Sequence, residues 1–152
     1  MALPKIGSKA PAFTLQDQNG DKHSLKDYSG STVVLYFYPK AMTPGCTVQA
    51  CGIRDSEKAL KKMGVKVLGV SIDAYPRLAK FAERDNLNFT LLSDEDHKVA
   101  DKYGVWGLKK FMGLKRTTFI LDKEGKVRYI MEKVNTKTHH DDVMKWIKEN
   151  LS

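Results

Sequence analysis

The sequence predicts a single α/β domain in which helices cover a mixed β-sheet. Two observations lead to this prediction. Short segments rich in β-branched and aromatic residues alternate with segments whose apolar residues recur at helical spacing. Near the end of the chain, two strand-like segments are followed by one last helical segment. This order of elements is typical of a sheet with helices on its faces. With 152 residues the chain fits one domain, which we expect to span residues 1–152.

The first part of the chain predicts a β-hairpin and then a buried strand. Residues 12–15 and 22–25 flank an Asn-Gly pair at 19–20, which is typical of a hairpin turn. Residues 32–38 read TVVLYFY, a composition that favours a central strand. Pro39 is expected to end this strand.

A helix and a second buried strand are expected next. The helix begins after the turn at residues 44–45 and stops at Gly64, a typical C-terminal residue. Its apolar positions at near-helical spacing are Ile53, Leu60 and Met63. Residues 65–72 then read VKVLGVSI, the second strong strand pattern.

The middle of the chain continues the alternation of helices and strands. Pro76 begins a helix that carries apolar residues at helical spacing. A short strand is expected around residues 89–92, and a further helix over about 95–103.

The last segments predict a hairpin and a terminal helix. Residues 117–121 and 126–131 flank a turn at 122–125, and a helix follows over about 138–150. The residues of this helix expected to face inward are Val143, Trp146 and Ile147. Together these elements predict a thioredoxin-like arrangement, a mixed central sheet flanked by helices, with an extra N-terminal β-hairpin.

Composition and charge narrow the classes of function. The net charge is +8, but lysines alternate with acidic residues, and the densest cluster, at 109–110 and 115–116, carries no nucleic-acid-binding motif. No apolar run approaches the ~18 residues that a membrane span needs. Residues 1–7 lack the apolar segment of a secretory signal. We therefore expect a cytoplasmic protein with a solvated basic surface, no specific nucleic-acid partner and no membrane association.

The two cysteines, Cys46 and Cys51, are too few for a disulfide-stabilised secreted scaffold. A structural zinc site needs four ligands, and the adjacent His139 and His140 lack the usual spacing of zinc-binding histidines. We expect no metal and no cofactor. These two histidines and His97 are expected to be surface or helix-start residues without a role.

The position of Cys46 favours a reactive thiol. The sulfur follows a strand and a turn and lies in the first turn of the predicted helix, where free backbone amides and the positive end of the helix dipole favour an anion. A thiolate is the nucleophilic form of cysteine. Thr43, three residues earlier, could direct its hydroxyl at a molecule bound beside the sulfur. The alternatives are that both cysteines are inert buried thiols and that Thr43 only caps the helix.

The segment around Cys46 resembles the active site of a known family. Residues 36–51 read YFYPKAMTPGCTVQAC, and the pattern Pro39-x-x-x-Thr43-x-x-Cys46 resembles the signature of the peroxiredoxins. The longer string is similar to the bacterioferritin comigratory, or Q-type, branch of that family. The similarity covers nearly the whole chain and includes residues 88–97 and 103–107.

The resemblance implies a thiol-dependent peroxidase that reduces hydrogen peroxide and organic hydroperoxides. Cys46 matches the peroxidatic cysteine, which becomes a sulfenic acid. Thr43 matches the residue that hydrogen-bonds the peroxide and the sulfur. Arg116 matches the arginine that stabilises the thiolate and the developing negative charge. Without the resemblance Arg116 could be an ordinary cation at a strand edge, no better a candidate than Arg54.

The resemblance also gives roles to three neighbours of Cys46. The amide of Gly45, with that of Cys46 itself, is expected to help stabilise negative charge. Pro39 would shield and shape the pocket. Gln49 lies where many peroxiredoxins carry glutamate, and it could hold the arginine with less charge assistance.

Cys51 matches the resolving thiol of this branch. Five residues along a helix rise about 7.5 Å and turn about 140°, which puts the two Cα atoms roughly 8–9 Å apart. A disulfide needs less than about 7 Å. Cys51 is therefore expected to be partly buried in the reduced protein, and the helix must unwind before the intramolecular disulfide can close. A dithiol protein such as thioredoxin would reduce that bond. The resemblance favours a monomer, with a weak dimer as the alternative.

Two alternative functions remain, and one segment is shorter than in the family that the chain resembles. A general disulfide oxidoreductase of the same fold should show Cys-x-x-Cys and a proline before the later hairpin strand, where this chain has residues 115–117 (KRT). A basic binding or holdase module would leave the cysteines incidental. Residues 107–115 are fewer than relatives commonly have, so this shortened loop could alter substrate access and partner contacts.

Overall fold

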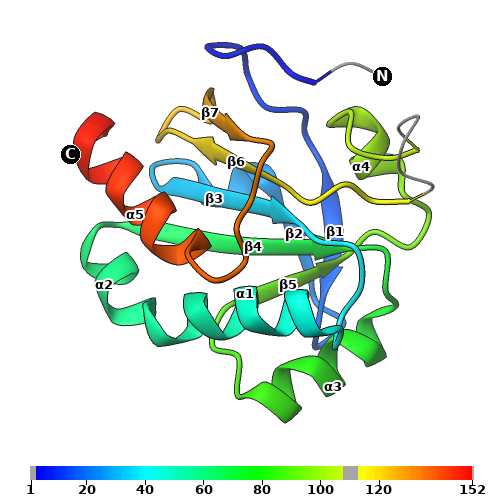
Figure 1. Ribbon diagram of the computed structural model, residues 1–152. Helices are drawn as coiled ribbons and strands as arrows, with labels where there is room; N and C mark the ends of the chain where they lie inside the picture. The colour runs from blue at the N-terminus through cyan, green and yellow to red at the C-terminus, as the bar shows by residue number, and fades with distance from the viewer. Residues whose placement is uncertain (1–2, 108–112, 152) are drawn as a thin grey trace.

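A seven-stranded mixed sheet forms the centre of the computed structural model, which describes residues 3–107 and 113–151 (Figure 1). The strand order is β2-β1-β5-β4-β3-β6-β7. β3, β4 and β5 run parallel, and the other neighbouring pairs are antiparallel. The strands are β1 (Thr14–Asp17), β2 (Lys22–Ser24), β3 (Thr32–Phe37), β4 (Val65–Ser71), β5 (Thr90–Ser93), β6 (Thr117–Leu121) and β7 (Val127–Met131).

Helices cover both faces of this sheet, so the predicted mixed sheet flanked by helices is confirmed. The helices are η1 (Leu25–Tyr28, a 3-10 helix), α1 (Pro44–Asp55), α2 (Glu57–Lys62), α3 (Tyr75–Asp85), α4 (Lys98–Lys102) and α5 (His139–Asn150). One apolar core contains buried residues of α1, α2, α3 and α5. The other lies on the opposite face, beneath α4 and the N-terminal segment. Figure 1 shows α1 and α5 on the same side of the sheet.

The register of the central strands determines which segments meet at the end of β3. All six residues of β3 are buried, because the strand lies between β4 and β6 and is covered on both faces. In the antiparallel β3–β6 pair, Phe37 lies opposite Thr117. The turn that leads from β3 to α1 therefore lies beside Arg116, the residue immediately before β6.

Three details differ from the sequence prediction. The helix predicted to follow the turn at 44–45 and to stop at Gly64 is two helices. They are separated at Ser56, whose φ and ψ of −99° and 4° are not helical. α4 is shorter than predicted, and the buried Asp94 carboxylate accepts hydrogen bonds from two amides in its first turn. Trp146 packs against the core as predicted but is only partly buried, and its ring stacks on Tyr129.

None of the helices within residues 3–107 and 113–151 combines the length and the apolar character that a membrane span requires. The basic cluster at 109–110 and the middle of the shortened loop lie outside the described residues. The two ends of that loop are joined, since the amide of Gly107 donates to the carbonyl of Gly113 at 3.1 Å.

Candidate active site

Cys46 lies in the first turn of α1 and is buried, with 2% of its surface exposed. Pro44, the first residue of α1, has no amide hydrogen to leave unpaired. The amide of Thr47 makes the first intrahelical hydrogen bond, to the carbonyl of Thr43 at 2.9 Å. The amides of Gly45 and Cys46 therefore belong to the positive end of the helix. Negative charge on the sulfur is favoured at this position.

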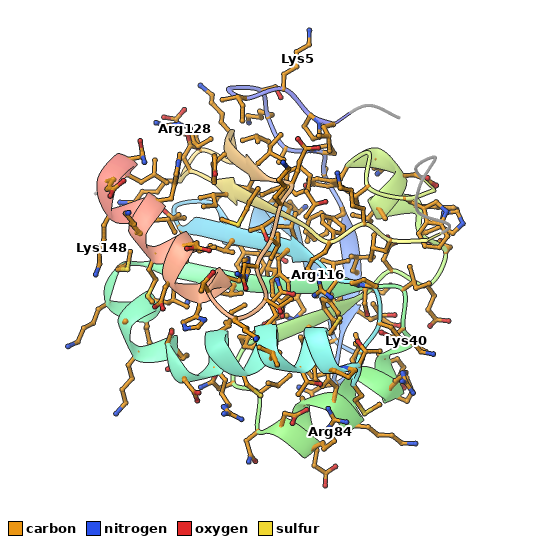
Figure 2. All side chains as sticks on the ribbon, in the orientation of Figure 1. Lys5, Lys40, Arg84, Arg116, Arg128 and Lys148 are labelled. Carbon is orange, nitrogen blue, oxygen red and sulfur yellow. The ribbon has the colours of Figure 1, made fainter. Side chains whose placement is uncertain are left out.

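Arg116 brings a full positive charge to the sulfur. Its Nη2 atom donates to Cys46 Sγ at 3.4 Å, and its Nη1 atom donates to Gln49 Oε1 at 2.5 Å. Figure 2 shows the Arg116 side chain in the middle of the molecule, whereas the labelled Lys5, Arg128 and Lys148 extend outward. The structure thus brings Cys46, Gln49 and Arg116 together, although Arg116 is 70 residues from Cys46.

The pair formed by Arg116 and Gln49 continues into a row of buried side chains. Gln49 Nε2 lies 3.2 Å from His139 Nδ1, and His139 Nε2 lies 2.8 Å from Thr118 Oγ1. His139 is fully buried. Burial is the main reason that the pKa of His139 is lowered to about 4, and nearby His140 adds to the effect. The imidazole is therefore neutral near neutral pH.

This environment corrects the expectation for His139 in one respect: the residue begins a helix, as expected, but it does not lie at the surface. His139 is the first residue of α5, but its side chain points into the core. The signal that could have revealed it is its spacing: His139, Val143 and Ile147 are four residues apart and are the buried residues of α5. A histidine in register with an apolar face belongs to the core.

Thr43 lies in the turn before α1, with extended backbone angles. Its hydroxyl donates to the carbonyl of Lys40 at 2.8 Å and makes no capping hydrogen bond to the helix. Thr43 thus occupies the N-cap position of α1, but its side chain does not cap the helix. Because the hydroxyl hydrogen is directed at Lys40, the oxygen of Thr43 can still accept a hydrogen bond.

An ion pair between the buried Asp73 and the partly exposed Arg77 anchors the same turn. Asp73 Oδ2 accepts hydrogen bonds from the amide of Ala41 and from Ser71 Oγ, both at 2.8 Å. Arg77 pairs with Asp73 at 3.2 Å and donates to the carbonyl of Ala41 at 3.1 Å. The amide of Ala41 is thus hydrogen-bonded to Asp73, and its carbonyl is hydrogen-bonded to Arg77. Asp73 and Arg77 have no signal in the sequence that points to this role, since they lie more than 30 residues from the turn they support.

Gly45 allows Arg116 to approach the helix. A Cβ atom at Gly45 would lie 3.3 Å from Arg116 Nη2, closer than ordinary van der Waals contact. Pro39 is exposed in the turn after β3. The structure therefore places Gly45 against the guanidinium and Pro39 at the surface near the site.

Both cysteines are free thiols, and Cys51 is partly buried. They lie on one continuous helix, α1, so a bond between them requires part of that helix to unwind. Two contacts from α3 hold α1 in place. Arg84 donates to Thr47 Oγ1 at 2.8 Å, and Arg54 donates to the carbonyl of Asp85 at 2.6 Å.

No group of three or more His, Cys, Asp or Glu side chains is arranged to hold a metal ion in the part of the chain that the structure describes. What the site offers is a buried sulfur beside fixed hydrogen-bond donors. Such donors stabilise negative charge that develops on the sulfur or on an oxygen bound next to it.

Comparison with known proteins relates this site to a family. Residues 6–130 match the AhpC/TSA family. The chain is 52% identical over 151 residues to peroxiredoxin Bcp of Escherichia coli K12, covering 96% of this chain and 97% of that relative.

Solved structures agree with this match. A crystal structure of peroxidoxin BcpB from Mycobacterium tuberculosis has a TM-score of 0.88 and 37% identity, covering 97% of this chain and 99% of that one. A structure from work on alkyl peroxide reduction by the Xanthomonas campestris bacterioferritin comigratory protein has a TM-score of 0.87 and 30% identity, covering 92% of each chain. The predicted thioredoxin-like fold and family are confirmed: the chain belongs to the AhpC/TSA family and is a peroxiredoxin of the Bcp branch.

Proposed function

We propose that this peroxiredoxin reduces hydrogen peroxide and organic hydroperoxides through Cys46. The thiolate attacks the terminal oxygen of the peroxide, the O–O bond breaks, and Cys46 becomes a sulfenic acid. The other oxygen leaves with the electron pair and takes a proton, giving water or an alcohol. The observation that carries this proposal is the contact between Arg116 and Cys46 Sγ at the positive end of α1.

Donors fixed around the sulfur would stabilise the charge that moves onto the peroxide oxygens. Arg116 and the amides of Gly45 and Cys46 supply them, and Gln49 holds Arg116 in place. The oxygen of Thr43 would accept a hydrogen bond from the peroxide O–H group, since its own hydrogen is directed at Lys40. Pro39, exposed beside this turn, would limit access to the site.

Cys51 would resolve the sulfenic acid. Its thiol attacks Cys46 Sγ, a disulfide forms, and the sulfenic oxygen leaves as water. The first turns of α1 must unwind for this step, which breaks the contact between Arg84 and Thr47. The exposed disulfide would then be reduced by a dithiol protein such as thioredoxin. Both cysteines belong to one chain, so a monomer can complete the cycle.

The relatives support the choice of substrate class. The E. coli protein is a peroxiredoxin, and alkyl peroxide reduction is studied in the X. campestris protein. On this basis we expect both hydrogen peroxide and small organic hydroperoxides to react with Cys46.

Stopped-flow measurement of peroxide consumption, with thioredoxin, thioredoxin reductase and NADPH, tests the proposal. The wild type should turn over repeatedly, Cys46→Ser should show no activity, and Cys51→Ser should consume one equivalent and then stop. Insulin reduction by the same protein variants with dithiothreitol, in the absence of thioredoxin, is the counter-assay. Activity toward insulin without peroxide consumption would instead indicate a general disulfide oxidoreductase.

A further inference from the structure

A row of four polar side chains begins at the reactive sulfur and ends in the core. Arg116 contacts Cys46 and Gln49, Gln49 contacts His139, and His139 contacts Thr118. Gln49, His139 and Thr118 are each fully buried. The proposed chemistry uses Arg116 and Gln49 but leaves His139 without a role.

Hydrogen-bond polarity permits only one arrangement of this row. A guanidinium can only donate, so the atom of Gln49 that faces Arg116 must be its carbonyl oxygen. The NH₂ group of Gln49 then faces His139 Nδ1, which must accept. The imidazole proton is therefore on Nε2, where it is donated to Thr118 Oγ1.

The opposite tautomer of His139 would disrupt the contact with Arg116. A proton on Nδ1 would face the NH₂ group of Gln49, and the amide would have to turn over to offer its oxygen. Its NH₂ group would then face the guanidinium, so that two donors meet where one hydrogen bond is now made.

We infer that His139 is a positioning residue for the reaction of Cys46: its neutral Nε2-H tautomer fixes the Gln49 amide, and the amide oxygen holds the Arg116 guanidinium against Cys46 Sγ. This inference rests on the proposed function of Cys46 as the reacting thiol. His139 does not touch the substrate. It acts through Gln49 and Arg116, and Thr118 Oγ1 accepts the proton on its Nε2 atom.

Two substitutions of His139 separate hydrogen bonding from packing. In His139→Asn, the side-chain oxygen can take the place of Nδ1 and accept from Gln49. In His139→Leu, a side chain of similar size offers no acceptor and leaves a buried NH₂ group of Gln49 unpaired. Without an acceptor at His139, the amide of Gln49 no longer has a fixed orientation and holds Arg116 less well, so we expect the rate to fall about tenfold.

The experiment measures two rate constants of Cys46: its reaction with hydrogen peroxide, and its alkylation by iodoacetamide at neutral pH. His139→Leu should slow both about tenfold, and His139→Asn should stay within about threefold of the wild type. His140→Leu makes the same change one residue later on α5 and is the matched control. It should leave both rates unchanged.

The same substitutions in a protein that also carries Gln49→Glu test whether His139 acts through Gln49. In Gln49→Glu, the two carboxylate oxygens are equivalent and need no orientation, and charge attraction holds Arg116. His139→Leu should therefore slow Cys46 less than about twofold when Gln49→Glu is also present. An equal loss in both backgrounds, or an equal loss in His139→Leu and His139→Asn, would overturn the inference, because packing alone would then explain it.

Thr118→Val keeps the inference testable if His139→Leu does not fold. It leaves the buried Nε2–H group without an acceptor, which disfavours this tautomer, so it should slow Cys46 in the Gln49 protein and much less in Gln49→Glu. The alkylation rate distinguishes a failure of the proposed peroxidase function from a failure of the proposed role of His139. A wild type that does not react with peroxide would refute the proposed function. Unchanged alkylation of His139→Leu would refute the positioning role.

Discussion

The buried His139 should make the folded protein sensitive to mild acid. The unfolded chain binds a proton at this histidine below about pH 6.5, whereas burial lowers the pKa in the folded protein to about 4. Protons therefore favour the unfolded state as the pH falls through this window, and the stability present above pH 6.5 is progressively lost. At about 1.4 kcal/mol per pH unit, the loss reaches roughly 3 kcal/mol near pH 4.

Electrostatic surroundings support the direction of this effect. His140 and Arg116 lower the pKa of His139 further, and Asp142 only partly offsets them. Protonation would also place a proton on Nδ1, facing the NH₂ group of Gln49.

Urea unfolding of the reduced protein at several pH values between 7 and 4 measures the effect. The free energy of unfolding of the wild type should fall by roughly 3 kcal/mol more than that of His139→Asn over this range. His97→Asn is the control, because the His97 side chain is 42% exposed and lies outside the core. Its pH dependence should follow the wild type. Parallel curves for the wild type and His139→Asn would refute the reasoning.

Three further predictions follow from close contacts. Gly45→Ala adds a methyl group 3.3 Å from Arg116 Nη2, so stopped-flow assays should show peroxide reacting about tenfold more slowly; an unchanged rate would contradict this. Asp73→Ala leaves a buried amide and a hydroxyl unpaired and should reduce the unfolding free energy in urea by about 2–4 kcal/mol; a loss below about 1 kcal/mol would argue against the anchor. Gly69→Ala places a Cβ 2.9 Å from the fully buried Tyr36 ring and should destabilise the protein by about 1–3 kcal/mol, and equal stability in urea would show that the ring can move.

Much of the fold could be predicted because its signals are local. The composition of residues 32–38 indicated β3, and the Asn-Gly pair at 19–20 indicated the first hairpin. Pro44-Gly45 before an apolar helical pattern likewise located the start of α1, and with it the place of Cys46. The break at Ser56 has no proline or glycine to mark it, so the sequence did not reveal it.

The site could be predicted only in part, because its contacts join distant segments. Family resemblance was needed to select Arg116, since its approach to Cys46 depends on the β3–β6 register. His139 lies 90 residues from Gln49, and two adjacent histidines at a helix start resemble surface residues. No motif near Asp73 in the sequence indicated that its side chain would bind the turn at Ala41.

The most direct test of the account asks which sulfur takes the oxygen atom. Cys51→Ser is treated with one equivalent of hydrogen peroxide in the presence of dimedone, which traps sulfenic acids, and the labelled peptide is identified by mass spectrometry. We predict one dimedone adduct, on the peptide that contains Cys46, and none in Cys46→Ser. An unlabelled Cys46 in protein that has consumed the peroxide would contradict the central claim.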